Sequence, residues 1–204
     1  RVHVHLVMKE ICRPLQTFSD WRELVSVVRD ALRAHQSAWE DHGILHRDIS
    51  VDNIFIYERP HSGVTGLLAN WDKAKRRTLV LNPTTLESSR SGTWQFLSAG
   101  LVTYPNKPHV LSDDLESVIH ILNCLAMKHL RTDHSRSPEA LTQLMEDIYD
   151  TRLDTGEGGH FKWLYVRSGS GFKFFAHRHS RKYPFIALLA ELSKLCRLQY
   201  ERLT

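Results

Sequence analysis

The chain has 204 residues, of which 42% are hydrophobic and 25% are charged. These shares are ordinary for a folded domain and exclude a collagen-like repeat, a coiled coil and a long disordered tail. The formal net charge is only +4, which is too small to indicate a nucleic-acid partner by itself. No uninterrupted apolar run approaches the roughly 20 residues that a membrane-spanning helix needs, so we expect no membrane association.

The three cysteines, Cys12, Cys124 and Cys196, are far apart and form no C-x-x-C pair. An odd, scattered set argues against a disulfide framework or a cysteine zinc site. We therefore predict reduced thiols and an intracellular protein, cytoplasmic or nuclear.

The first half of the chain alternates between extended and helical patterns. Residues 2–9 alternate apolar and polar side chains, which predicts a short strand. A helix is predicted from about Asp20, which forms a capping pair with Glu23, to Gly43, which has the character of a C-terminal cap. Two short strands over 54–57 and 65–69 then predict a β-hairpin with a longer loop.

The second half is predicted to be mainly helical. Residues 70–111 are rich in Ser, Thr, Asn and Pro and are predicted to be irregular. Helices are predicted to begin at Asp113 and at Pro138, the latter ending at about Tyr149. Residues 151–181 are predicted to be loop, and 183–203 a final amphipathic helix. The fold class is therefore α+β, mostly α.

One segment carries a recognisable chemical pattern. Residues 46–53 read HRDISVDN, which matches the kinase catalytic-loop pattern H-R-D-L-x-x-x-N. In that pattern a loop presents one carboxylate to a substrate hydroxyl, while an amide five residues later reaches a metal bound to the nucleotide phosphates. The segment lies between a predicted helix and a predicted hairpin, which is the setting the motif requires.

Four motifs in the same order resemble the fungal-type protein kinase family. They are GILHRDIS at 43–50, WDKA at 71–74, GTWQFLS at 92–98 and DDLES at 113–117. The likeness covers nearly the whole chain and weakens after about residue 130. It implies a protein-kinase-like large (C-terminal) lobe with a remnant strand of the small lobe.

The resemblance divides the chain into two parts. Residues 1–13 would hold the last strand of the small lobe and the hinge, and residues 14–204 the helical large lobe. The hinge that meets the adenine of ATP would consist of Lys9, Glu10, Ile11 and Cys12. ATP, Mg²⁺ and a protein substrate are the implied ligands.

The resemblance also implies residue roles around the catalytic loop. Asp48 would be the catalytic base, Asn53 would help to hold Mg²⁺, and Asp114 would brace the loop from the central helix. His46 and Arg47 would support the loop, Arg47 as a partner for a phosphate on the activation segment.

Three further residues carry implied consequences for substrate and phosphate. Gly92 and Thr93 would belong to the segment that shapes the peptide-substrate site. Ser50 stands where many serine/threonine kinases have a lysine, which removes a cation from the transferring phosphoryl group, although the fungal-type family itself has this serine.

The metal site departs from the pattern. The magnesium-binding aspartate should open the motif at 70–72, but the chain has Asn70 there. An amide oxygen can bind Mg²⁺ without contributing charge, whereas hard cations favour carboxylates. Asp72 is a candidate replacement, and it would have to reach the metal from a different direction.

Three further observations bear on activity. Gly100 stands where the family has a glutamate that pairs with an arginine, so we expect looser anchoring of that segment. No glycine-rich phosphate loop or V-A-I-K strand precedes His46, and the glycines at 156–159 and 169–171 lie in the wrong setting to replace one. Because the chain begins at Arg1 without an initiator Met, we expect it to be part of a longer protein, with the small lobe upstream or lost. We expect this chain alone to be inactive.

The hydroxyl-rich stretch after Lys73 has two open interpretations: a phosphorylatable activation segment or a solvated polar loop.

The sequence leaves three hypotheses for the function. The chain is the large lobe of a Ser/Thr protein kinase, or a pseudokinase that serves as a protein-interaction module, or, least supported, a basic nucleic-acid-binding domain. The basic clusters at 73–77 and 177–182 lack the interleaved aromatic residues that the last function would need.

Overall fold

A computed structural model describes residues 9–61, 63–77, 91–130, 137–153, 158–168 and 184–201. Its strands are β1 (Cys12–Pro14), β2 (Ile44–Leu45), β3 (Ile54–Arg59), β4 (Gly63–Leu68) and β5 (Lys75–Arg76). Its α-helices are α1 (Trp21–His42), α3 (Ala99–Thr103), α4 (Leu111–His129), α5 (Pro138–Met145), α6 (His160–Ser168) and α7 (Pro184–Glu201). Short 3-10 turns cover Leu15–Thr17, Val51–Asn53, Trp71–Lys73 and Trp94–Phe96. The strand predicted at 2–9 lies outside the described residues, apart from Lys9.

The first helix follows its sequence signals at both ends. The side chain of Asp20 accepts a hydrogen bond from the backbone N–H of Glu23, which satisfies one of the free donors at the helix start. Gly43 ends the helix with φ 62°, a left-handed conformation that glycine adopts without steric cost. The predicted bounds of this helix are confirmed.

The predicted hairpin is confirmed as the centre of an antiparallel sheet with strand order β1-β3-β4, and β2 pairs with β5 in a second, two-stranded sheet. Helix α1 packs directly on β4. A Cβ atom on Gly66 would lie 1.9 Å from the carbonyl oxygen of Val27, so only glycine allows this approach. Asp30 of α1 reinforces the contact by accepting hydrogen bonds from Gly66 N and Thr65 Oγ1.

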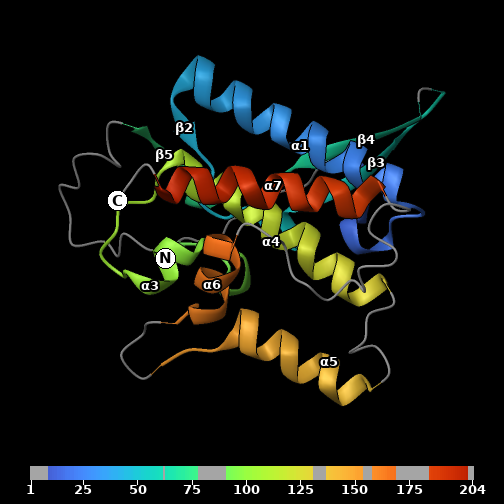
Figure 1. Ribbon diagram of the computed structural model, residues 1–204. Helices are drawn as coiled ribbons and strands as arrows, with labels where there is room; N and C mark the ends of the chain where they lie inside the picture. The colour runs from blue at the N-terminus through green and yellow to red at the C-terminus, as the bar shows by residue number, and fades with distance from the viewer. Residues whose placement is uncertain are drawn as a thin grey trace.

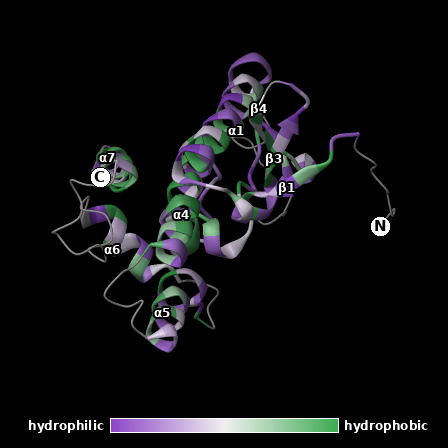
Figure 2. Cartoon of the chain, turned by 90° about the vertical axis from the view of Figure 1, so that its right-hand side faces the viewer, coloured by the Kyte–Doolittle hydropathy of each residue, from purple (hydrophilic) through white to green (hydrophobic). Residues whose placement is uncertain are grey.

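Helix α4 lies at the centre of the molecule, between α1 and the sheet on one side and α5 on the other, as Figures 1 and 2 show. Nearly all of its residues from Asp113 to Met127 are buried. The core around it combines side chains from α1, β3, α4 and α7, including Leu24, Val27, Ile54, Ile56, Ile121, Leu125 and Leu189. No helix in the described part of the chain is long and apolar enough to cross a membrane.

The later helices agree only in part with the sequence prediction. Ser137 caps α5 as predicted, and a π-helical turn over Glu146–Asp150 prolongs that helix to the expected end. The loop predicted over 151–181 is wrong at 160–168, which forms α6, and the irregular stretch predicted over 70–111 contains α3. Both helices are short and carry aromatic, β-branched or glycine residues of low helix propensity, so packing rather than local preference stabilises them.

Candidate active site

One buried carboxylate, that of Asp114, holds the loop between β2 and β3 in place. Asp114, near the start of α4, accepts hydrogen bonds from the backbone N–H groups of His46 and Arg47 at 3.1 and 3.2 Å. The Nε2 atoms of His35 and His109 each lie 2.8 Å from its oxygens. Burial alone would raise the pKa of Asp114, but the hydrogen bonds from His109 and His35 hold that pKa well below its usual value. Asp114 therefore remains ionised and ties the loop to α1 and α4.

His46 links this loop to the end of β4. Its Nε2 lies 2.9 Å from the carbonyl oxygen of Ala69, and its Nδ1 accepts a hydrogen bond from Asp48 N at 3.3 Å. Burial lowers the pKa of His46, and the two contacts fit a neutral ring protonated at Nε2. Its ring meets the edge of Trp71, in the turn that follows Asn70. His46 thus fixes the position of Asp48 relative to residue 70.

Arg47 adopts a left-handed backbone conformation with φ 67° and is buried. Its Nη1 lies 3.5 Å from the carbonyl oxygen of Lys73. The hydroxyl groups at 78–90 that could carry a phosphate for Arg47 lie outside the described residues, as does the basic cluster at 177–182.

Two distant segments contact the carboxylate of Asp48. Its Oδ1 accepts hydrogen bonds from Thr93 N at 2.7 Å and from Thr93 Oγ1 at 2.8 Å. Its Oδ2 forms an ion pair with Lys73 Nζ at 2.9 Å. Gly92 precedes Thr93 with φ 129°, and a Cβ there would collide with Leu97. Asp48, Gly92 and Thr93 were predicted site residues, and Lys73 was named only as part of a motif and a basic cluster. Its pairing with Asp48 was not predicted, because only the contact between distant segments reveals it.

The two amides expected to bind metal instead bind each other. Asn53 Nδ2 donates a hydrogen bond to the carbonyl oxygen of Asp48 at 2.7 Å, which directs Asn53 Oδ1 away from that loop. Asn70 Nδ2 then donates to Asn53 Oδ1, also at 2.7 Å. Asn70 reaches this position with a left-handed backbone, φ 60°, a conformation that asparagine tolerates better than most residues.

This arrangement does not fit Mg²⁺. One of the two lone pairs on the Asn53 amide oxygen already accepts a hydrogen bond, and neither amide brings the negative charge that a hard cation favours. Asp72 is exposed in the next turn, and among the described residues no hydrogen bond or ion pair joins it to Asn53 or Asn70. The described residues also contain no group of three His, Cys, Asp or Glu side chains suited to a metal.

The predicted hinge residues lie apart from this cluster. Ile11 is 92% exposed, and Cys12 begins β1, where it pairs with Tyr57 of β3. Tyr57 is four residues along the strand from Asn53, a separation of about 13 Å at the usual rise per residue. Lys9 and Glu10 are exposed ahead of that strand. Their contact with adenine stays a prediction.

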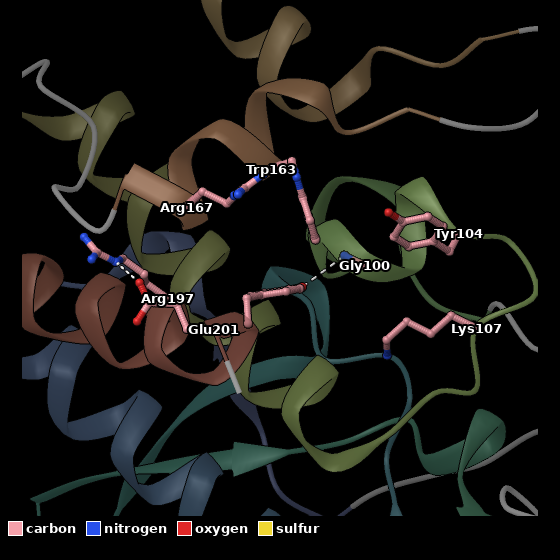
Figure 3. A pocket seen from close by; sticks show the side chains of 8 residues that line it. Gly100, Tyr104, Lys107, Trp163, Arg167, Arg197 and Glu201 are labelled. Carbon is pink, nitrogen blue, oxygen red and sulfur yellow. Dashed lines mark hydrogen bonds and ion pairs between the residues drawn. The ribbon is translucent and has the colours of Figure 1, made fainter. Parts of the chain in front are cut away.

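Helix α3 is anchored without the expected glutamate at position 100. Glu116 of α4 accepts a hydrogen bond from Ala99 N at 2.7 Å and another from the hydroxyl of Tyr200 at 2.6 Å. The same Tyr200 oxygen accepts from Gly100 N at 3.0 Å, a bond drawn in Figure 3. Burial, followed by the charge of Glu116, raises the pKa of Tyr200, which keeps the phenol protonated as a donor. The loosening expected from Gly100 is therefore offset by two residues that the sequence analysis did not single out.

A cavity of about 560 Å³ opens beside Gly100 (Figure 3). Its lining consists of Gly100, Tyr104, Lys107, Trp163, Arg167, Arg197, Tyr200 and Glu201. Two of its cations are already paired, Lys107 with Asp113 at 2.6 Å and Arg197 with Glu201 at 2.7 Å. With these two pairs neutralised, Arg167 gives the cavity a net charge of +1.

A buried lysine secures the segment that follows Thr93. Lys162 of α6 donates hydrogen bonds to the carbonyl oxygens of Trp94 and Leu97 at 3.1 and 3.0 Å. Burial lowers its pKa to about 7. Helix α6, which the sequence analysis missed, therefore supports the segment that presents Thr93 to Asp48.

Comparison with curated proteins finds no match for this chain. A family model described as fungal protein kinase matches residues 1–125. The matched stretch contains the catalytic-loop pattern, Asn70, the Gly92–Thr93 segment and the start of α4 through Leu125. Together with the four motifs, this match shows that the chain belongs to the fungal protein kinase family.

Proposed function

We propose that the chain forms the large lobe of a protein kinase that transfers the γ-phosphoryl group of ATP to Ser or Thr hydroxyls of a protein. In this reaction the hydroxyl oxygen forms a bond to the γ-phosphorus, and the bond from that phosphorus to the bridging oxygen breaks. ADP leaves with the electron pair, and the hydroxyl proton passes to Asp48. The family membership supports the reaction class.

The observation that carries this proposal is the way the Asp48 carboxylate is held. Thr93 fixes Oδ1 through both its backbone and its hydroxyl group. Asp114 fixes the loop itself through His46 N and Arg47 N. A general base must be oriented toward the hydroxyl before its pKa matters, and this double attachment supplies that orientation.

A second candidate function is supported by the Asn70–Asn53 hydrogen bond. A pseudokinase retains the fold for protein interaction after losing its metal site, and here the two amides satisfy each other. In that case Asp48 and Thr93 keep the arrangement of an active site but catalyse no phosphate transfer.

Phosphate transfer by the full-length protein distinguishes the two functions. We expect incorporation of the labelled γ-phosphate of ATP into a Ser/Thr peptide mixture. Asp48→Asn should lower the rate about 10²- to 10⁴-fold, the usual contribution of a general base. Asp52→Asn is the matched control, because Asp52 is exposed in the same loop and should leave the rate within about twofold of the parent. A parent protein without transfer, in which Asn70→Asp creates it, would overturn the kinase proposal in favour of the pseudokinase.

A further inference from the structure

We propose that Lys73 supplies, from the turn after β4, the positive charge that meets the transferred phosphoryl group beside Asp48. The inference rests on the proposed function, which brings the terminal phosphate of ATP to this carboxylate. It assigns a catalytic role to a residue outside the catalytic-loop pattern.

The first step concerns which oxygen of Asp48 is open to a substrate. A carboxylate has about four lone-pair directions, two on each oxygen. Thr93 N and Thr93 Oγ1 occupy both directions on Oδ1, whereas Lys73 Nζ occupies one on Oδ2. Among the described residues, the remaining direction on Oδ2 is therefore the place where a hydroxyl can donate its proton.

The second step places Lys73 relative to that hydroxyl. Lys73 Nζ is 2.9 Å from Oδ2, and a hydroxyl donating to the same oxygen would lie at about 2.7 Å. Two groups that share one acceptor oxygen lie within about 5 Å of each other. Because the hydroxyl oxygen attacks the γ-phosphorus, the ammonium group lies within reach of the oxygens of the transferred phosphoryl group.

The third step concerns how many hydrogen bonds the ammonium group of Lys73 can still donate. A lysine has three N–H donors, and Asp48 is its single side-chain partner in the described part of the chain. The Lys73 side chain is 46% exposed, whereas that of Asp48 is 11% exposed. Donors therefore remain on the open side of the pair, where a phosphate would approach.

The fourth step concerns the other charges at the site. Ser50 is buried and uncharged, so that position supplies no cation. The Asn53–Asn70 pair is also uncharged and does not fit Mg²⁺. Lys73 is consequently the cation that the described residues place in contact with Asp48, and charge stabilisation of a moving phosphoryl group needs one close by.

The test compares Lys73→Met, Lys73→Arg and the control Arg76→Met in the whole protein. Arg76 is exposed in β5, three residues along the same segment, so its replacement removes an equal charge without a contact to Asp48. We expect Lys73→Met to lower kcat about 10²-fold, as loss of one electrostatic stabiliser does, while KM for ATP rises less than about fivefold. Lys73→Arg should keep at least about a tenth of the parent rate, and Arg76→Met should match the parent. A kcat for Lys73→Met within about threefold of Arg76→Met would overturn the inference and leave the proposed function intact.

Calorimetric titration with ADP and with the non-hydrolysable β,γ-imido analogue of ATP gives a readout that needs no turnover. We expect Lys73→Met to weaken binding of the analogue about threefold to fivefold and to leave ADP binding unchanged, since ADP lacks the terminal phosphate. If the parent shows no transfer but this selective loss appears, the proposed function and the catalytic role of Lys73 fail, whereas its contact with the terminal phosphate is upheld. If the parent shows no transfer and Lys73→Met has no selective effect, or neither nucleotide binds, both proposals are overturned.

Discussion

The side-chain amide of Asn70 donates a hydrogen bond to the amide oxygen of Asn53 over 2.7 Å, in the place where the family pattern calls for an aspartate and a metal ion. Because neither amide carries a charge, the pair needs no cation to offset repulsion between its oxygens. The bond thus joins the two amides directly. A substitution at position 70 is therefore the most direct way to alter the candidate metal site.

We predict that Asn70→Asp makes the protein less stable without metal and responsive to it. The new carboxylate would face Asn53 Oδ1 at hydrogen-bond distance, while Asn53 Nδ2 remains on the carbonyl oxygen of Asp48. Two facing acceptors should cost about 1–3 kcal/mol of unfolding free energy. Thermal unfolding with and without Mg²⁺ measures this: the variant should melt lower than the parent and recover on addition of Mg²⁺, whereas the parent should not respond. Asp72→Asn replaces an exposed neighbour and should behave as the parent. A parent that already responds to Mg²⁺ would contradict the conclusion that the Asn53–Asn70 pair does not fit this ion.

We predict an acid-labile contribution from Asp114. Its folded-state pKa is lowered below the ordinary value of 3.8, so its contribution to stability is complete above about pH 4–5 and disappears as the pH falls further through the folded pKa. Asp114→Asn should remove this acid dependence and destabilise the protein at pH 7 by about 3–5 kcal/mol, as expected when one partner of a buried polar network is lost. Urea unfolding between pH 2.5 and pH 7 provides the measurement. Equal pH slopes in parent and variant would contradict the prediction.

Lys162 should give a second rise of stability with pH, of the same sign as that of Asp114 but in a higher pH range. Burial lowers its folded pKa to about 7 from 10.5, so above pH 7 the unfolded chain binds more protons than the folded one at this group. Stability should therefore rise between about pH 7 and pH 10, by an amount on the order of a few kcal/mol. Lys162→Met should flatten that rise relative to the parent. Lys194→Met, an exposed lysine of α7, is the control and should leave the slope unchanged.

We predict that Tyr200→Phe loosens α3. The change removes the donor to Glu116 and the acceptor for Gly100 N, and should cost about 1–2 kcal/mol. Hydrogen exchange at the Gly100 amide should accelerate more than exchange in α1. Tyr104→Phe provides a matched control, because Tyr104 is 55% exposed. Unchanged exchange at Gly100 in the Tyr200 variant would show that Glu116 alone is sufficient to hold the segment.

The sequence predicted the elements whose signals are local. Asp20, Gly43 and Ser137 occupy capping positions, and the apolar periodicity of the sequence predicted helix α4. Helices α3 and α6 could not be predicted in this way because burial against α4 and α7 stabilises them rather than propensity. The catalytic-loop pattern pointed to Asp48, and the family resemblance pointed to Asp114.

The missing parts of the site are pairs between distant segments. Lys73 contacts Asp48 across 25 positions, and Tyr200 contacts Glu116 across 84. A charged residue in a polar loop and a tyrosine in a terminal helix carry no local signal of such pairing. Only the folded arrangement supplies it.

The hydrogen bonds to Asp114 determine which substitutions the 46–53 loop can tolerate. The carboxylate joins α1, that loop and the segment before α4 through His35, His46 N, Arg47 N and His109. Neither Asn53 nor Asn70 belongs to that set. The contacts that hold the loop are therefore separate from the two amides, so a substitution at position 70 can alter the candidate metal site while the loop that carries Asp48 keeps its shape.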